Sequence, residues 1–131
     1  MQPFECVSFL LVDNNRILLE KRSIHKASDP GLTCIPGGHI EDGETQPQAL
    51  CRELKEELDL TANNYHYLCS LYHPTSELQL LHYYVVTEWQ GEVKALEAES
   101  VSWEKLESDS VSIEADKRAI EEFKRVNHHL C

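Results

Sequence analysis

The sequence predicts an α/β fold, an α/β/α sandwich in which a mixed β-sheet lies between helices. Two segments with helical periodicity, residues 45–58 and 113–130, are separated by several apolar runs that favour strands. The 131 residues suffice for one domain with a proper core, and no repeat or linker divides them. We therefore expect a single domain over residues 1–131.

Three strands are predicted before the first helix. Apolar, β-favouring runs cover residues 5–12, 16–22 and 31–35. The turn signal Asp13-Asn14-Asn15 makes the first two strands a hairpin. The third strand leads into Pro36-Gly37-Gly38, and Gly43 follows shortly after. Glycines this close together predict a loop whose backbone conformations a side chain would forbid.

The first helix is predicted over residues 45–58. Thr45 is a suitable N-cap, Gln48 stands where a capping-box partner belongs, and Pro47 falls in the first turn. Three leucines recur at helical spacing and form one apolar stripe that should dock on the sheet: Leu50, Leu54 and Leu58.

Further strands are predicted after this helix, over residues 65–72, 78–89 and 101–103. Pro74-Thr75-Ser76 separates the first two, and an acidic segment over residues 92–100 precedes the third. Residues 113–130 then form an amphipathic helix with three apolar residues along one side: Ile120, Phe123 and Leu130.

An arc of three glutamates runs beside the leucine stripe of the first helix. Glu53, Glu56 and Glu57 fall within about 100° of one another, and like charges at this spacing repel. A bound cation would relieve the repulsion, and carboxylate oxygens suit Mg²⁺ or Mn²⁺. The alternative is a solvated face with ordinary ion pairs, such as Arg52 with Glu56.

The spacing of residues 38–60 resembles the signature of the Nudix hydrolases. The matching residues are Gly38, then Glu44 after five residues, Arg52-Glu53-Leu54 after seven more, and Glu56-Glu57 and Asp59-Leu60 after one residue each. Only Asp59 departs, because the family has Gly there. Asp visits the left-handed conformation that ends a helix more readily than most residues, so we expect Asp59 to affect stability more than chemistry.

The resemblance implies a metal-dependent hydrolase and a role for each acidic residue. Glu56 and Glu57 would be metal ligands together with the Gly37 carbonyl, and Glu53 would be a ligand or the water-activating base. Glu44 would support these ligands without binding the metal itself, and Arg52 would orient a glutamate rather than touch substrate. A late acidic ligand is implied at Glu97, with Glu99 as its alternative; either would otherwise be a solvated loop acid.

Residues 81–103 look more specifically like the MutT-type nucleoside triphosphate pyrophosphohydrolases. That likeness implies hydrolysis of a purine or oxidised purine nucleotide, such as 8-oxo-dGTP, to the monophosphate and pyrophosphate. It also implies substrate contacts at Arg22, Gly38 and Asp116, although Asp116 would otherwise cap the last helix or be a solvated acid in its first turn.

Two other functions stay open at this stage. The chain could hydrolyse another diphosphate, such as ADP-ribose or a dinucleoside polyphosphate. It could also be a non-catalytic nucleotide-binding module, although such a module does not need the acidic cluster.

Composition limits the partners. A net charge of −11 argues against a nucleic-acid surface, and no apolar run approaches a membrane span. The five cysteines, at positions 6, 34, 51, 69 and 131, form no CxxC motif, and no signal-peptide pattern is present. We expect a cytoplasmic protein with reduced thiols, a small-molecule nucleotide substrate, and a monomeric or homodimeric state. The histidines show no metal spacing on one helix face and are given no role.

Overall fold

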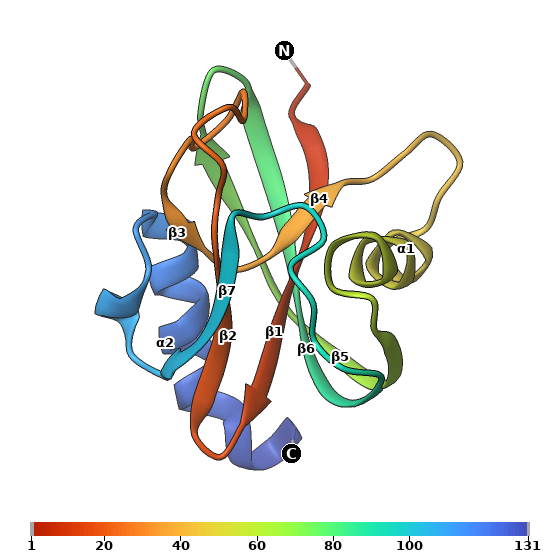
Figure 1. The fold of residues 1–131 in the computed structure, drawn as a ribbon, viewed down its shortest axis with the longest axis vertical. Helices are drawn as coiled ribbons and strands as arrows, with labels where there is room; N and C mark the ends of the chain where they lie inside the picture. Colours follow the sequence, from red (N-terminus) through yellow and green to blue (C-terminus); the bar gives the residue numbers. More distant parts are fainter. Residues whose placement is uncertain (1, 131) are drawn as a thin grey trace.

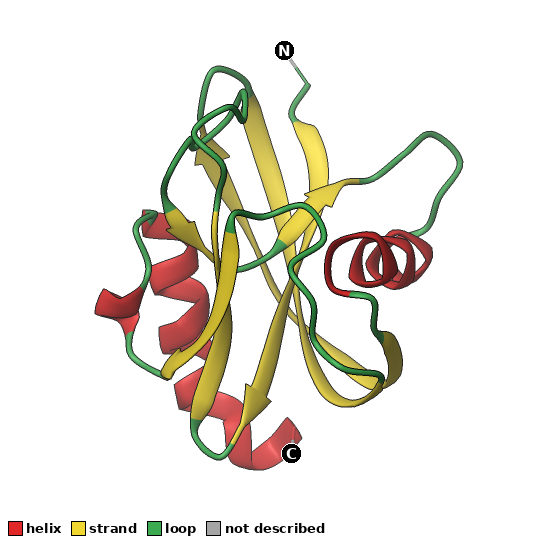
Figure 2. Ribbon diagram, viewed as in Figure 1, coloured by secondary structure: helices red, strands yellow, loops and turns green. Residues whose placement is uncertain are grey.

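The computed structural model describes residues 2–130 as a mixed sheet between two helices (Figure 2). Helix α1 (Gln46–Leu58) lies against one face and α2 (Glu114–Leu130) against the other (Figure 1). The strands are β1 (Phe4–Asp13), β2 (Arg16–Lys21), β3 (Thr33–Cys34), β4 (Gly37–His39), β5 (Thr61–Pro74), β6 (Leu78–Gln90) and β7 (Ser100–Lys105). Because β1 and β6 are parallel and the other pairs antiparallel, the predicted sandwich with a mixed sheet is confirmed.

The sheet divides into two arms that share β1: one arm contains β2, β3 and β7, and the other contains β4, β5 and β6. Strand order is β3-β2-β1-β6-β5, with β4 added to β1 and β7 added to β2. β1 pairs with β2 only at Val12 and Asp13, and its earlier residues Cys6–Ser8 pair with β4 instead. The arms therefore diverge away from the hairpin turn. The cleft described below is lined from both arms.

The predicted hairpin turn is confirmed. Asn14 and Asn15 both have positive φ, 51° and 60°, which matches the backbone twist of a two-residue hairpin. Asn adopts this left-handed conformation more readily than most residues, so the Asn-Asn pair accounts for the tight connection.

Each helix covers its own apolar core. Leu50, Leu54 and Leu58 of α1 are buried with Phe9 and Leu18 of the sheet, as the leucine stripe predicted. On the opposite face, buried Ile120 and Phe123 of α2 pack against the other side of the sheet, and Leu130 is partly buried beside them. Both amphipathic predictions are confirmed.

The predicted loop at Pro36-Gly37-Gly38 is wrong for Gly37–His39, which form β4. A Cβ on Gly37 would lie 2.1 Å from the Val7 carbonyl oxygen, so glycine is needed there for close backbone approach. Only Gly43 of the three has the left-handed backbone that the loop prediction required, with φ +84°.

Other boundaries also shift. β5 is longer than the predicted strand, because polar residues at its start still pair with β6 through bulges. The strand predicted over 31–35 shrinks to β3, and a short 3₁₀ helix, η1 (Ser108–Ser110), was not predicted. The four described cysteines are free thiols, as expected, whereas Cys131 lies outside the described residues. No helix within residues 2–130 is both long and apolar enough to cross a membrane.

Asp59 ends α1 in the left-handed conformation that the motif position requires. Its φ and ψ are 59° and 40°, and its carboxylate lies 3.1 Å from Lys55 Nζ and 3.2 Å from Lys94 Nζ. Both ion pairs are solvent-exposed and should contribute little.

We expect Asp59→Gly to leave turnover unchanged. Glycine relieves the left-handed strain but loses the two exposed ion pairs, so the melting temperature should move by no more than about 4 °C. Thermal melts and steady-state kinetics on the two proteins would test this. A large loss of activity would give Asp59 a direct functional role.

Candidate functional site

The acidic face of α1 is positioned from both ends of the helix. The predicted capping box at its start is confirmed: Gln48 N donates to Thr45 Oγ1 at 3.2 Å, and Thr45 N donates to Gln48 Oε1 at 2.9 Å. Along the helix, Glu53 and Glu57 are buried, at 8% and 5% exposure, whereas Glu56 is exposed. The arc of three glutamates therefore has two members inside the protein and one at its surface.

Arg52 lies at the centre of this acidic group. Its guanidinium donates to both oxygens of Glu44, at 2.7 and 2.9 Å, and to Glu53 at 2.9 Å and Glu56 at 3.0 Å. It also donates to the His39 carbonyl oxygen at 2.9 Å, which ties the helix to the end of β4. Arg52 thus contacts carboxylates on every side. This is the environment expected of a residue that orients glutamates.

Glu44 joins the loop before α1 to Arg52. Besides its two bonds from Arg52, it accepts a hydrogen bond from the Glu41 backbone N–H at 2.9 Å. These bonds favour the ionised form, so the pKa of Glu44 is lowered, first by Arg52 and then by Glu41. The two bonds from Arg52 to Glu44 hold the guanidinium in place.

The Glu53 carboxylate packs directly on the backbone of Gly38. A Cβ added to Gly38 would lie 2.4 Å from Glu53 Cδ and 2.5 Å from each of its oxygens. Burial raises the pKa of Glu53, and the hydrogen bond from Arg52 opposes this rise. The sequence placed Gly38 among the substrate contacts, and its observed contact is with Glu53.

Glu57 is the least satisfied polar group in the site. Its Oε2 is buried and has no hydrogen-bond partner among the described residues. The pKa of its carboxyl group is raised, first by burial and then by the negative charges of Glu20, Glu53 and Glu97. A buried carboxylate without a partner is costly, so this oxygen marks a place for a proton or a cation.

The acidic residues fit a hard divalent cation in donor type. All the side-chain donors are carboxylate oxygens, which Mg²⁺ and Mn²⁺ prefer, and the buried Glu57 Oε2 has no hydrogen bond to lose on binding a cation. Within residues 2–130, however, no three acidic, histidine or cysteine side chains converge on one point. Arg52 accounts for part of this, because it binds Glu53 and Glu56 itself.

Glu97 and Glu99 have different surroundings. Glu97 adds negative charge at both Glu53 and Glu57, and the neighbouring Leu96 N donates to the Glu57 carbonyl oxygen at 3.0 Å. Glu99 instead is exposed and lies 3.5 Å from Lys21 Nζ. Of the two late acids, Glu97 is the better placed to join the site on α1.

A cleft adjoins the acidic group and runs between the two arms of the sheet. Gly37 and Gly38 line it, and Gly38 is also the residue that touches Glu53. The polar residues that line the cleft come from both arms, from the loop after β2 and from the start of α2: Ser8, Arg22, Ser28, Asp29, His39, His73, Gln79 and Asp116. The acidic site and the cleft therefore meet at β4.

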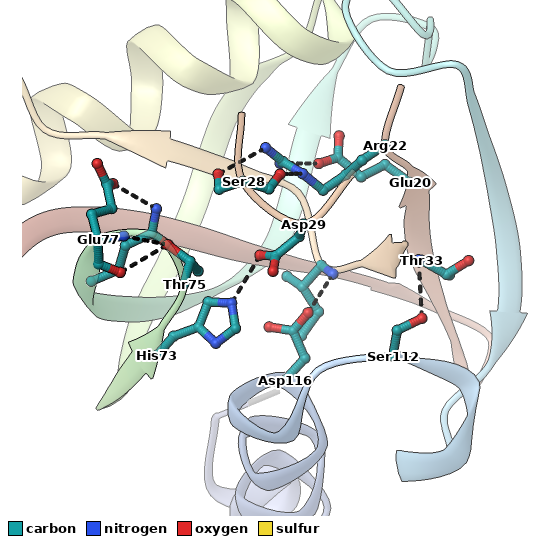
Figure 3. Close-up of polar contacts among 12 residues, drawn as sticks. Glu20, Arg22, Ser28, Asp29, Thr33, His73, Thr75, Glu77, Ser112 and Asp116 are labelled. Carbon is teal, nitrogen blue, oxygen red and sulfur yellow. Dashed lines mark hydrogen bonds and ion pairs between the residues drawn. The ribbon is translucent and has the colours of Figure 1, made fainter. Parts of the chain in front are cut away.

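Arg22 and Asp116, both predicted substrate contacts, line this cleft (Figure 3). Arg22 donates to the Ser28 carbonyl oxygen at 3.0 Å and to Glu20 at 3.3 Å. Asp116 accepts from the Ile35 backbone N–H at 2.9 Å and from the Tyr83 hydroxyl at 2.6 Å.

Asp116 is only 1% exposed, so the alternative of a solvated first-turn acid is wrong. Its two hydrogen bonds run to residues outside α2, so the observed bonds do not cap the helix either. Burial raises the pKa of its carboxyl group to about 7, although both hydrogen bonds act in the opposite direction. Asp116 is therefore a buried acceptor at the wall of the cleft.

Sequence reasoning missed several residues of this region. His73, given no role, is buried, and its Nε2 lies 2.8 Å from Asp29 Oδ2, which ties the loop after β2 to β5 (Figure 3). Glu20, within the predicted strand over residues 16–22 but given no role, is buried at 3% exposure. Strand alternation could have identified Glu20, because it shares a face with the core residue Leu18.

Comparisons with known proteins agree with this geometry. Residues 3–126 match the family model described as the NUDIX domain. The chain is 33% identical over 104 residues to the CTP pyrophosphohydrolase of Escherichia coli, covering 79% of this chain and 76% of that protein. It is 31% identical over 101 residues to the 8-oxo-dGTP diphosphatase of the same species, covering 76% and 78%.

A solved structure is similar over nearly the whole chain. The MutT NUDIX hydrolase from Burkholderia pseudomallei superimposes with a TM-score of 0.82 at 27% identity, covering 93% of this chain and 98% of that one.

Proposed function

Because this chain belongs to the Nudix family and is a pyrophosphohydrolase of phosphoanhydride bonds, we propose that it hydrolyses a nucleoside triphosphate to the monophosphate and pyrophosphate. One observation carries the proposal: of two buried glutamates of α1, Glu57 has an unpartnered oxygen and Glu53 packs on Gly38, which lines a cleft that also contains the buried hydrogen-bond acceptor Asp116. The glutamates suit a metal-bound diphosphate, and the buried acceptor in the cleft suits the nucleobase of the substrate.

The metal would be Mg²⁺ or Mn²⁺, held by carboxylates of Glu53, Glu56, Glu57 and Glu97 and by the Gly37 carbonyl. When bound, it would neutralise the phosphate oxygens and polarise phosphorus. Alternatively, Glu53 would be the base that accepts a proton from the attacking water, because burial raises the pKa of its carboxyl group above its ordinary value.

The other residues would bind and orient. Arg52, fixed by both oxygens of Glu44, would keep the Glu53 and Glu56 carboxylates in place. Arg22 would offer its positive charge to the phosphates from the cleft wall. Its present partners, Ser28 and Glu20, already fix its direction, so little side-chain freedom would be lost on binding.

The nucleobase of the substrate would lie in the cleft beside Asp116. A buried carboxylate favours a base with N–H donors, and both a purine such as 8-oxoguanine and cytosine present them. The two relatives described above act on one of each, judged by their names. We keep the oxidised purine as the first candidate and CTP as the second, which the CTP pyrophosphohydrolase relative favours.

A substrate panel tests the proposed class. Nucleoside triphosphates including 8-oxo-dGTP and CTP would be compared with nucleoside diphosphates, ADP-ribose and a dinucleoside polyphosphate, in Mg²⁺ and with products identified. We expect a triphosphate to have the highest kcat/KM. Preferential cleavage of ADP-ribose would overturn the triphosphate proposal, and binding without turnover would favour a nucleotide-binding module.

Asp116→Ala should lower kcat/KM for the preferred nucleotide by roughly tenfold or more, and much less for a poor substrate. The reason is that the variant removes a buried acceptor that discriminates between bases. Kinetics on both substrates measure the difference. Because Asp116 also bonds Ile35 and Tyr83, a thermal melt must accompany them. Equal losses on both substrates would reduce Asp116 to a structural residue.

The proposal includes a cytoplasmic location, for which the free thiols of the four described cysteines are the support. A monomeric or homodimeric state and the lack of a nucleic-acid partner stay predictions.

A further inference from the structure

One buried carboxylate beside the proposed metal site comes from outside the family motif. Glu20 lies near the end of β2 and is 3% exposed. Leu18, two residues earlier, packs in the core beneath α1, and side chains two apart on a strand point to the same side. Glu20 therefore points toward the α1 side of the sheet.

Glu57 is buried on the facing side of α1, at 5% exposure. Residues 96–99 bring the two elements together, because Leu96 N donates to the Glu57 carbonyl oxygen and Glu99 N donates to the Lys21 carbonyl oxygen, both at 3.0 Å. In keeping with this placement, burial raises the pKa of the Glu57 carboxyl group most, and the negative charge of Glu20 raises it further. Two carboxylates buried near each other repel, and each loses its hydration. Some group must compensate this arrangement.

The cations nearby form an ion pair with only one side of the pair, although the charge of Lys26 acts to lower the pKa of both carboxyl groups. Arg22 Nη1 lies 3.3 Å from Glu20 Oε1, and its Nε is already used by the Ser28 carbonyl oxygen (Figure 3). Glu57 Oε2, by contrast, has no partner in the described part of the chain. The Arg22–Glu20 ion pair therefore leaves the buried Glu57 oxygen without a bonded cation.

We infer that Glu20 is a further carboxylate ligand of the divalent-metal site, supplied by β2 and facing Glu57 of α1. This inference rests on the proposed function, because it requires the cation that Glu57 would bind. A divalent cation held between the two side chains would give the unpartnered Glu57 oxygen a partner and offset the repulsion. Hard cations take carboxylate ligands from separate elements readily.

Metal binding by the whole protein tests this inference directly. Isothermal titration with Mn²⁺, in the absence of nucleotide, would be run on the EDTA-treated native protein and on Glu20→Gln. Gln keeps the size of the side chain and removes its charge. We expect the dissociation constant to rise by about tenfold or more, in the range seen when the support of a metal site is removed.

Two matched variants separate this role from others. Glu104→Gln, on the exposed part of β7, removes the same charge at a distance and should bind Mn²⁺ like the native protein. Arg22→Gln removes the ion-pair partner of Glu20 and should bind Mn²⁺ at least as tightly. If Arg22→Gln weakens binding as much as Glu20→Gln does, Glu20 acts through Arg22 and the inference is wrong.

Thermal melts give a readout that does not depend on turnover. In EDTA, Glu20→Gln should melt no lower than the native protein, because the amide carries no buried charge. In Mn²⁺, its melting temperature should rise less than that of the native protein. If the variant lacks a cooperative melt, Glu20→Asp replaces it; this variant keeps the charge but shortens the reach, and it should also bind Mn²⁺ more weakly.

The outcomes distinguish the inference from the function on which it rests. A native protein that binds no Mn²⁺ would overturn the proposed metal site as a whole. Native binding with an unchanged dissociation constant in a folded Glu20 variant would overturn only the role of Glu20, and would leave Arg22 as the cation that compensates Glu20.

Discussion

Glu57→Gln should lower turnover by about three orders of magnitude at saturating Mg²⁺ while leaving the fold intact. The substitution keeps the shape of a buried side chain and removes one charge from the carboxylate whose Oε2 has no other partner in the described structure. Steady-state kinetics measure the loss. Glu104→Gln, exposed on β7, is the matched control and should keep native turnover.

The same variant should be more stable than the native protein when metal is removed. Burial and the charge of Glu20 raise the pKa of Glu57, so the Glu57 carboxyl group binds its proton more tightly in the folded chain than in the unfolded chain. The free energy of unfolding of the native protein in EDTA therefore falls as the pH rises from the ordinary glutamate pKa toward the raised one.

Gln does not titrate, so the advantage of the variant should grow between about pH 6 and about pH 8. Thermal melts at both pH values measure it. Native turnover in a folded variant would remove Glu57 from the site, and a variant that melts lower in EDTA would contradict the uncompensated carboxylate.

Gly38→Ala should fold normally and lose about two orders of magnitude in turnover, because small displacements of a catalytic group are this costly. The new Cβ would lie 2.4 Å from Glu53 Cδ, and the flexible end of Glu53 is the part that can move. Stability should therefore change little, whereas the carboxylate leaves its position.

Gly43→Ala, in the loop between β4 and α1, is the control with the opposite pattern. No atom lies within 4 Å of its added Cβ, but its φ of +84° strains any L side chain. It should cost about 1 kcal/mol of stability and leave turnover close to native. Kinetics and melts on both variants decide the matter. Equal activity losses would show that the whole segment from β4 to α1 matters, rather than the contact between Gly38 and Glu53.

The sequence predicted α1 and its surroundings well because the signals there are local. A capping box, a leucine stripe and an Asp at the helix end all act within one helix, and the structure confirms each of them. The motif spacing also indicated which glutamates to examine. Their separation into buried Glu53 and Glu57 and exposed Glu56 needed the position of the sheet.

The features that were missed depend on contacts between distant segments. Gly37 and Gly38 looked like turn residues, but their lack of side chains allows one to approach β1 and the other to accommodate Glu53. His73 pairs with Asp29 across 44 positions of sequence, and no local pattern indicates such a partner. Alternation along β2 places Glu20 on the α1 side of the sheet, but the residue that it faces depends on where α1 packs.

The most direct test of the central claim is product identification with the EDTA-treated protein and the triphosphate it cleaves fastest. Phosphorus NMR would follow the products before and after Mg²⁺ is restored. The acidic site on α1 predicts no turnover in EDTA, followed by equal amounts of nucleoside monophosphate and pyrophosphate once Mg²⁺ is present. Turnover that persists in EDTA, or release of orthophosphate and a nucleoside diphosphate, would contradict it.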